Sequence, residues 1–386
     1  MRVLYASDVA PADTTSGAKI IYRHLRLLAQ RHEVMIAHFD GVAVPGCTTV
    51  RLPTRPLAAR GLASRRRRHF EAFNAIVGFR ARDSDLLRLA REFRADVVLT
   101  LAEGGLCYNA ARVARRIGKP LAAFFHDWSP DWRDHPAWSR RWMNRAFRRL
   151  YQRCALPLCI SRALQEELGP HAHATILPPI PDPFLSAPAA TAINPVAVYA
   201  GVLNGLAQTE TRALGQACLA LAEPAVIFFG PRPHWGDGLD ARMIEHGILR
   251  GFMPLAELDA TLAAASCLLV IMPFSEAGRR FATYSFPSKL TEYTRLGRPI
   301  VIWGPKYCSA VDWAQRSHAA LAVTDASPEA VLGEILRLST LNNPEAGRLG
   351  DAARSAYVRE FLPSMIQQKF ELALSGLIAV ATPAVP

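Results

Sequence analysis

The sequence predicts an α/β protein with two tandem doubly wound domains that face a central cleft. Its 386 residues are too many for one simple core. Short, nearly continuous apolar runs alternate with amphipathic helical patterns, which is typical of parallel sheets covered on both faces. A Pro- and Ala-rich stretch at 174–196 interrupts this alternation once, and the alternation then begins again. We therefore expect a first domain at 1–180, a linker at 181–195 and a second domain at 196–386. The last helix is a candidate to pack back on the first domain.

Each half supplies its own strands and helices. In the first half, strands are expected at 2–6, 33–39, 96–101, 120–125 and 156–160, and helices at 17–31, 83–94, 105–117 and 140–153. In the second half, strands are expected at 196–200, 225–229, 248–252, 267–272, 299–303 and 319–323. The helices expected there are 209–222, 255–265, 287–296, 328–339 and a long one near 349–376. Ligands of open α/β sheets bind outside the carboxyl ends of the strands, so the residues that follow the strands are expected to carry the function.

Composition indicates a globular protein with an uneven charge. The hydrophobic fraction is 50% and the charged fraction 20%. No apolar run reaches the roughly 18 residues of a membrane span, and the N-terminus reads as a strand rather than a signal peptide. Seven scattered cysteines favour reduced thiols in a cytoplasmic protein. The net charge of +12 divides into +13 for residues 1–185 and −1 for 186–386, so the first half is expected to face an anionic partner.

Several strand-end loops are candidates for ligand binding. Gly17 stands before a helix and His126 follows the strand 120–125, while Gly201 and Gly205 follow the strand 196–200. Glycines let the backbone approach a ligand closely, and a histidine beside a cleft can hydrogen-bond a hydroxyl or relay a proton. The alternatives are ordinary turns and a structural histidine that caps its strand.

The string "PFSEAGRRFATYSFPSKLTE" carries the strongest signal. This long loop holds Arg279 and Arg280 and leads Ser288 and Lys289 into a helix, with Glu292 on the same face as Lys289. A diphosphate in front of this helix would be held by backbone N–H groups, the serine hydroxyl and the ammonium group. Glu292 would accept hydrogen bonds from a diol such as ribose. The alternative is a surface pair of Lys289 and Glu292, which would stabilise little.

The string "FPSKLTEYTRLGRPIV" resembles the nucleotide-sugar signature of retaining glycosyltransferases of the GT-B fold, of the family-four type of bacterial sugar transferases. That fold consists of two Rossmann-like domains. The resemblance implies that Ser288 and Lys289 hold the donor diphosphate and that Glu292 holds the ribose hydroxyls. It also implies that His126, in "FFHD", lies by the donor sugar and that Gly17 leaves room for phosphate. Together with Gly201, Arg279 and Arg280 these are the expected site residues, with His126 and Lys289 as the catalytic pair.

The chain also departs from the family's pattern. Where the family has an arginine and a lysine after the first donor-domain strand, this sequence reads Gly201-Val202-Leu203-Asn204. Arg279 or Arg280 is the candidate substitute for the missing arginine. The family's frequent first glutamate falls on Tyr284.

The resemblance implies transfer of a sugar, with retention, from a nucleoside-diphosphate sugar of UDP or GDP type to a hydroxyl acceptor. A saccharide or a lipid-linked saccharide is the expected acceptor, in synthesis of a cell-surface polysaccharide or glycolipid, and no metal or other cofactor is expected. A GT-B protein without transfer activity, such as a sugar-nucleotide epimerase or an inactive partner, is the alternative.

Two basic segments bear on the partner, one at 63–70 and the other the helix at 138–154. In this helix Trp138, Trp142, Ala146, Leu150 and Cys154 recur at helical spacing between arginines. Docking on an anionic membrane surface, at the inner face of the cell membrane, is one interpretation. A helix packed on its own sheet with a solvated basic face is the other. The basic charge also invites nucleic acid, but no nucleic-acid-binding motif accompanies it, so no nucleic acid is expected as a partner.

Overall fold

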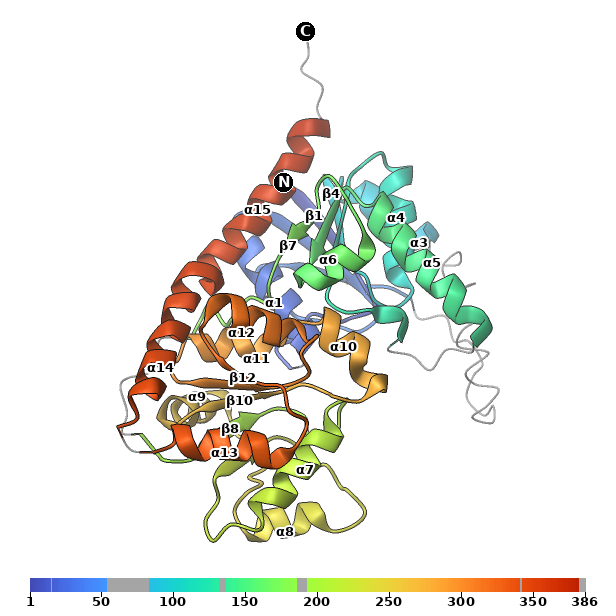
Figure 1. Cartoon of the computed structure of the whole chain (residues 1–386). Coiled ribbons are helices and arrows are strands. Elements are labelled where there is room, and N and C mark those ends of the chain that lie inside the picture. The colour runs from blue at the N-terminus through green and yellow to red at the C-terminus, as the bar shows by residue number, and fades with distance from the viewer. Residues whose placement is uncertain (15, 54–82, 132–136, 186–192, 341, 382–386) are drawn as a thin grey trace. The chain divides into compact units, whose positions relative to one another are not determined.

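The structure, a computed structural model, describes residues 1–14, 16–53, 83–131, 137–185, 193–340 and 342–381 (Figure 1). The chain divides into two compact units. Unit 1 comprises Met1–Ile180 together with Pro363–Pro386, and unit 2 comprises Pro181–Leu362. Unit 1 is therefore built from two separate pieces of the chain.

Unit 1 contains a parallel seven-stranded sheet in the order β3-β2-β1-β4-β5-β6-β7. Its strands are β1 (Arg2–Ala6), β2 (Glu33–His38), β3 (Thr48–Arg51), β4 (Val97–Leu101), β5 (Leu121–Phe125), β6 (Leu156–Cys159) and β7 (Thr175–Ile176). Every residue of β4 and β5 is buried, which explains their continuous apolar sequences. The strand order reverses between β1 and β4, and the loops that follow these two strands diverge there.

The helices of unit 1 include one from the far end of the chain. They are α1 (Ser16–Leu28), α3 (Asp83–Glu92), α4 (Leu106–Arg116), α5 (Ala137–Arg153), α6 (Arg162–Leu168) and α15 (Pro363–Ala381). Phe370 of α15 is fully buried, with its ring centroid 5.3 Å from that of Phe124 on β5. Gln367 Oε1 lies 2.8 Å from His24 Nδ1 on α1. These contacts fix α15 to unit 1.

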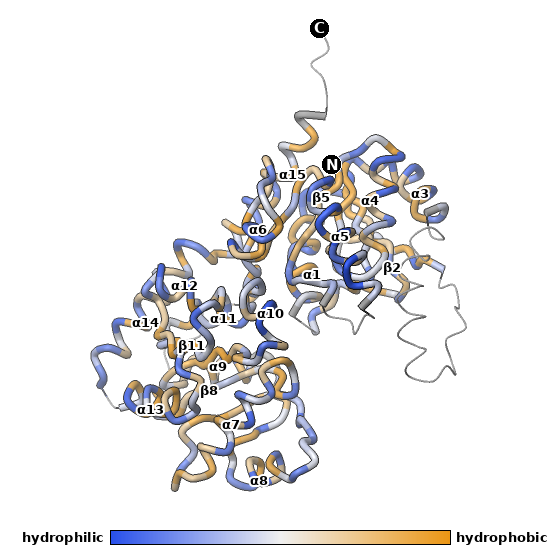
Figure 2. Tube along the Cα trace, turned by 45° about the vertical axis from the view of Figure 1, so that its right-hand side comes forward, coloured by the Kyte–Doolittle hydropathy of each residue, from blue (hydrophilic) through white to orange (hydrophobic). Residues whose placement is uncertain are grey.

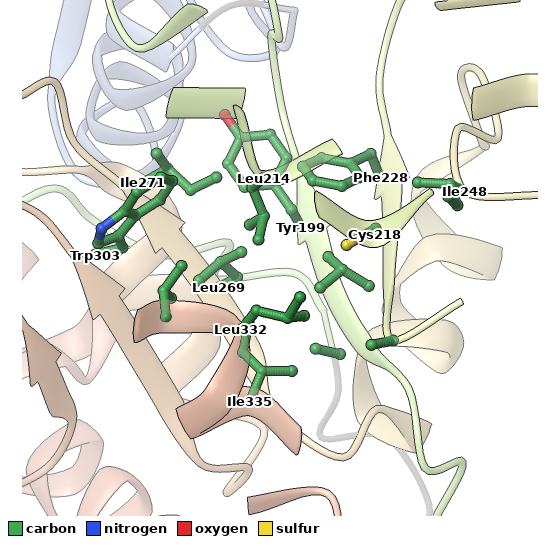
Figure 3. Close-up of a cluster of buried hydrophobic side chains, with 14 of the residues drawn as sticks. Tyr199, Leu214, Cys218, Phe228, Ile248, Leu269, Ile271, Trp303, Leu332 and Ile335 are labelled. Atoms are coloured by element: carbon green, nitrogen blue, oxygen red, sulfur yellow. The ribbon is translucent and has the colours of Figure 1, made fainter. Parts of the chain in front are cut away.

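Unit 2 contains a parallel five-stranded sheet in the order β12-β11-β10-β8-β9. Its strands are β8 (Ala197–Ala200), β9 (Val226–Phe229), β10 (Leu268–Ile271), β11 (Ile300–Trp303) and β12 (Leu321–Val323). Its helices are α7 (Gln208–Cys218), α8 (Leu239–Glu245), α9 (Leu255–Ala264), α10 (Arg279–Tyr284), α11 (Ser288–Thr294), α12 (Ser309–Ser317), α13 (Pro328–Leu338) and α14 (Pro344–Ala356). One cluster of buried side chains from β8–β11, α7 and α13 forms its core, with Trp303 fully buried (Figure 3). The topological switch lies between β8 and β10, where a doubly wound sheet binds its ligand.

Two sequence expectations in this unit were wrong. The segment 248–252 is not a strand: an isolated bridge joins Phe228 to Leu249, and the left-handed Gly251 (φ 51°) interrupts the regular ladder beyond it. The long helix near 349–376 is broken, because α14 passes into a π-helical turn at Tyr357–Phe361 and the extended Leu362 precedes Pro363. This break is also the point where the chain returns to unit 1.

Candidate functional site

Lys289 lies at the topological switch of unit 2. Its Nζ is 3.9 Å from the ring centroid of Tyr199 on β8, and the Tyr199 hydroxyl donates to the Val202 carbonyl at 3.0 Å. The fully buried Tyr293, one turn further along α11, accepts a hydrogen bond from the Ala200 N–H at 3.2 Å. Burial raises the pKa of the Tyr293 hydroxyl well above its usual range, so it remains protonated. These two tyrosines fix α11 to the end of β8 and hold the ammonium group there.

Two glycines make room for this arrangement. A Cβ on Gly201 would lie 2.6 Å from Lys289 Nζ, and a Cβ on Gly230 would overlap the Gly201 carbonyl oxygen. Both approaches are closer than real Cβ contacts, so glycine at 201 lets the ammonium group rest against the backbone. The structure thus brings together the predicted residues Gly201 and Lys289.

Ser288 and Glu292 flank Lys289 on α11. Ser288 is the first residue of the helix and half-buried, and the preceding Pro287 provides no side-chain cap for the first turn. Glu292 Oε2 accepts a hydrogen bond from the Asp182 N–H at 3.3 Å. The first residues of the expected linker therefore belong to unit 2 and pack at this site.

The arginines of the preceding segment lie on a short helix rather than in the expected loop. Arg279 begins α10, and its guanidinium stacks 4.5 Å from the centroid of Tyr307, on the loop after β11, and pairs with Glu276 at 3.4 Å. Arg280 is exposed on the same helix. The loops after β8, β10 and β11 all lie at the carboxyl edge of the sheet, so both arginines remain at the edge that carries Lys289.

In unit 1, Gly17 lies in the first turn of α1 rather than in a loop before it, and a Cβ there would meet nothing within 4 Å. His126 directly follows β5, is 8% exposed, and its Nδ1 has no partner among the described residues. Burial, and to a lesser extent the neighbouring His24, lowers the pKa of His126 to about 3. His126 is therefore a neutral imidazole at physiological pH, able to hydrogen-bond but not to act as a proton donor in the imidazolium form.

Three groups at or near these edges were not predicted from sequence. Asp8, two residues past β1, accepts hydrogen bonds from the Gly105 and Leu106 N–H groups at 2.5 and 2.6 Å and so caps α4. Glu210, 5% exposed, accepts from the Phe274 N–H at 2.8 Å and links the loops after β8 and β10. Arg295 forms a buried ion pair with Asp259 that ties α11 to α9. Of these groups, only Asp8 could have been suspected from the local sequence, because it comes two residues after a predicted strand.

The helix α5 also differs from its predicted packing. Its buried face consists of Met143, Phe147, Leu150 and Tyr151, with Cys154 just beyond its end. Trp138 and Trp142, which were expected on the apolar side of the helix, are 53% and 39% exposed. Trp138 and Trp142 adjoin the buried positions Ser139 and Met143, so they lie beside the buried face of the helix rather than on it. The basic run at 63–70 lies outside the described residues.

Within the described part of the chain, no group of three or more His, Cys, Asp or Glu side chains is arranged to hold a metal ion, and no helix is long and apolar enough to cross a membrane.

Comparisons with known proteins agree with this architecture. Residues 17–179 match Glycosyltransferase Family 4. The crystal structure of Anabaena HepE in complex with UDP superposes with a TM-score of 0.70 at 14% identity, over 97% of this chain and 100% of that one. A glycosyltransferase from Rickettsia africae gives 0.67 at 11% identity over 98% of both chains, and WaaG, a glycosyltransferase involved in lipopolysaccharide biosynthesis, gives 0.63 at 13% over 97% and 99%. No curated protein matches the chain. The structural neighbours show the fold, and the family match over residues 17–179 shows the class of enzyme. The chain is a glycosyltransferase with the GT-B fold, and its residues 17–179 match the model of Glycosyltransferase Family 4.

Proposed function

We propose that this glycosyltransferase moves a sugar from a nucleoside-diphosphate sugar, of UDP or GDP type, to a hydroxyl of a saccharide or lipid-linked saccharide, with retained anomeric configuration. The observation that carries the proposal is the ammonium group of Lys289, held against Gly201 at the switch point of unit 2. A doubly wound sheet binds its ligand at that point. A UDP donor is the first choice, because structures of the neighbour HepE hold UDP, UDP with glucose, and UDP-glucose.

The donor diphosphate is proposed to bind in front of α11. Lys289, the Ser288 hydroxyl and the uncapped N–H groups of the first turn would donate to its oxygens. As the glycosidic bond breaks, negative charge develops on the leaving diphosphate, and these donors stabilise that charge. Lys289 takes the electrostatic role that a metal ion has in other transferases, so the proposal includes no cofactor. Arg279 and Arg280 are proposed to add positive charge at the same edge.

Glu292 is proposed to bind the ribose. One of its oxygens accepts from the Asp182 N–H, and a carboxylate has further acceptor capacity for two vicinal hydroxyls. For His126 the proposal concerns only the hydrogen-bonding ability of its imidazole. A neutral imidazole with an unpartnered Nδ1 can hydrogen-bond a sugar hydroxyl, which is the role implied by the resemblance of "FFHD".

The test of the donor site is a pair of substitutions that separate charge from packing. Lys289→Met keeps the aliphatic stem against Tyr199 and removes the ammonium group. We expect it to lower kcat/KM with UDP-sugar by roughly 10- to 100-fold, the loss of one charge-assisted hydrogen bond. Lys119→Ala, at an exposed turn before β5, is the control and should leave the rate unchanged. Full transfer by Lys289→Met would exclude this donor site, and sugar-nucleotide isomerisation without acceptor would instead indicate an epimerase.

We further propose that α5 docks on an anionic membrane surface, where lipid-linked acceptors reside. Trp138 and Trp142 are exposed beside the exposed Arg141 and Arg145 (Figure 2 colours much of α5 as hydrophilic). Tryptophans with arginines on one exposed segment suit the interface of an anionic bilayer, where each basic residue contributes about 1 kcal/mol. This setting fits synthesis of a cell-surface polysaccharide or glycolipid at the inner face of the cell membrane.

Vesicle sedimentation tests this docking. The wild-type chain should bind phosphatidylglycerol vesicles and not phosphatidylcholine vesicles. The double variant Arg141→Glu/Arg145→Glu should bind weakly, whereas Arg115→Glu/Arg116→Glu, with the same change in charge at the end of α4, should bind normally. Equal loss in both variants would indicate attraction by net charge alone and contradict docking through α5.

A further inference from the structure

We infer that an open pocket of about 450 Å³ in unit 2 binds a neutral sugar ring. Its volume lies within the roughly 300–1,000 Å³ of small-molecule sites. The pocket lies at the carboxyl ends of the neighbouring strands β8 and β9, between the start of α7 and the loop that follows β9. Its lining consists of Asn204, Gln208, Arg212, Pro233, His234, Trp235, Gly236 and Asp237. The inference rests on the proposed function, since the sugar is that of the donor or of the acceptor, and it adds the place of recognition.

The pocket presents hydrogen-bonding groups that the described part of the protein does not use. The side chains of Asn204, Gln208 and His234 make no hydrogen bond to the described residues. The indole N–H of Trp235 is buried and also lacks an acceptor among the described residues. An amide both donates and accepts, as each hydroxyl of a sugar does.

The charges of the pocket disfavour an anion. The guanidinium of Arg212 forms an ion pair with Asp237 and lies 5.1 Å from the ring centroid of Trp235. The positive charge of Arg212 is therefore already neutralised. A phosphate would meet no uncompensated positive charge among these residues.

The aromatic ring of the pocket disfavours a nucleobase. Trp235 is 4% exposed and has Arg212 over one face, so its indole presents no face on which a base could stack. A neutral polyhydroxyl ring needs no stacking face, and it can use the hydrogen-bond donors and acceptors that this lining presents.

The pocket and the Lys289 site share the loop that follows β8. Gly201 contacts the ammonium group, and Asn204 follows it by three residues, so their Cα atoms are at most about 11 Å apart. A sugar joined to a diphosphate at Lys289 lies within that reach.

Saturation-transfer NMR on the full chain tests the inference. The probes are free glucose, galactose, mannose and N-acetylglucosamine, and UDP-glucose, UDP-galactose, UDP-N-acetylglucosamine and GDP-mannose. Gln208→Ala removes one pocket amide. Gly236→Phe introduces a bulky ring at the pocket lining, where a Cβ meets nothing within 4 Å. Gln216→Ala, exposed two turns further along α7, is the matched control.

We expect both pocket variants to lose at least about fivefold of the sugar-proton signal, the loss of one hydrogen bond, while the nucleobase signal and the control stay unchanged. Loss confined to the sugar of a nucleotide conjugate identifies the donor sugar, and loss confined to a free monosaccharide identifies the acceptor. Unchanged sugar signals, no sugar signal in the wild type, or an equal fall of the nucleobase signal would each overturn the inference. Absence of any nucleotide signal in the wild type, by contrast, would count against the proposed function.

Discussion

At the scale of single residues, the contact between Gly201 and Lys289 makes a prediction of its own. In Gly201→Ala the new Cβ must displace the ammonium group, and alanine also fits poorly at a φ of 156°. We expect KM for the donor to rise roughly tenfold and unfolding free energy to fall by about 1–2 kcal/mol. Gly205→Ala is the control in the same loop, because its Cβ would meet only Val202 at 3.9 Å. Donor kinetics of the two variants, measured side by side, check this; equal KM values would separate Lys289 from donor binding.

The buried pair His24 and His126 predicts how unit 1 responds to pH. Burial lowers the pKa of His24 to about 4 and that of His126 to about 3. Below pH 6.5 the unfolded chain binds protons that the folded unit does not, so stability is complete above pH 6.5 and falls as the pH drops toward the folded values. At pH 4.5 the loss is on the order of 2–3 kcal/mol for each group.

Hydrogen exchange of the α15 amides measures this loss, because α15 packs on His24. Exchange protection in the wild type should fall between pH 6.5 and 4.5 beyond the intrinsic pH effect. In His24→Leu the fall in protection should be smaller, because the contribution of His24 to the loss of stability is absent. The same slope in the variant and the wild type would show that His24 does not control it.

At the scale of elements, one helix supplies two glycines with opposite expectations. A Cβ on Gly350 of α14 would lie 2.5 Å from the Gly297 carbonyl oxygen, whereas a Cβ on Gly347 would meet nothing within 4 Å. Gly350→Ala is expected to destabilise unit 2 by about 1–3 kcal/mol through overpacking. Gly347→Ala is expected to stabilise it by about 0.5–1 kcal/mol through helix propensity. Denaturant titration of both variants measures the two changes in unfolding free energy. Changes of the same sign would contradict the close packing at Gly350.

The ion pair between α11 and α9 yields the second prediction at this scale. Arg295 is 4% exposed and Asp259 12% exposed in their side chains, so Arg295→Leu leaves a buried carboxylate without its partner. The expected cost is about 3–5 kcal/mol. Arg316→Ala, which breaks the exposed pair with Asp312, should cost at most about 1 kcal/mol. Replacing both Arg295 and Asp259 by Leu should recover most of the loss; thermal unfolding in which the double variant is no better than Arg295→Leu would argue against a charge effect.

Local sequence predicted some elements better than others. Buried strands such as β5 and β10 lie within one residue of their predicted bounds, because continuous apolar runs have few alternatives in a covered sheet. The segment 248–252 is also apolar, but whether it pairs depends on the backbone angles at Gly251. Helix α10 was read as a loop, because only six residues separate its start from Ser285 and its pattern is too short to show a period.

At the scale of the whole molecule, the repeat of the strand–helix pattern predicted two doubly wound sheets, and the fold contains them. The candidate site was predictable only in part. Lys289 follows from a local motif, whereas its supports Tyr199 and Tyr293 come from two elements far apart in the chain, and the pocket at Trp235 joins the loops of two strands. Such groups come together only because of the order of the strands in the sheet, and no local stretch of the sequence reveals that order.

The return of α15 predicts that unit 1 depends on the end of the chain. Removing residues 363–386 would expose the apolar surface around Phe124 that Phe370 covers. We expect the shortened chain to bind a hydrophobic dye strongly and to lose the protection of β5 amides, while unit 2 keeps its own melting transition. A control with only residues 382–386 removed should behave as the full chain. A native-like spectrum of the chain that lacks 363–386 would show that unit 1 is complete without α15.

The same discontinuity orders events during synthesis. The first 180 residues leave the ribosome long before α15 does, and all of unit 2 is made in between. Unit 2 therefore has its complete sequence available for folding while unit 1 still waits for its last helix. During that interval the surface around Phe124 and His24 stays uncovered, and it is the stretch of nascent chain that a ribosome-associated chaperone would bind.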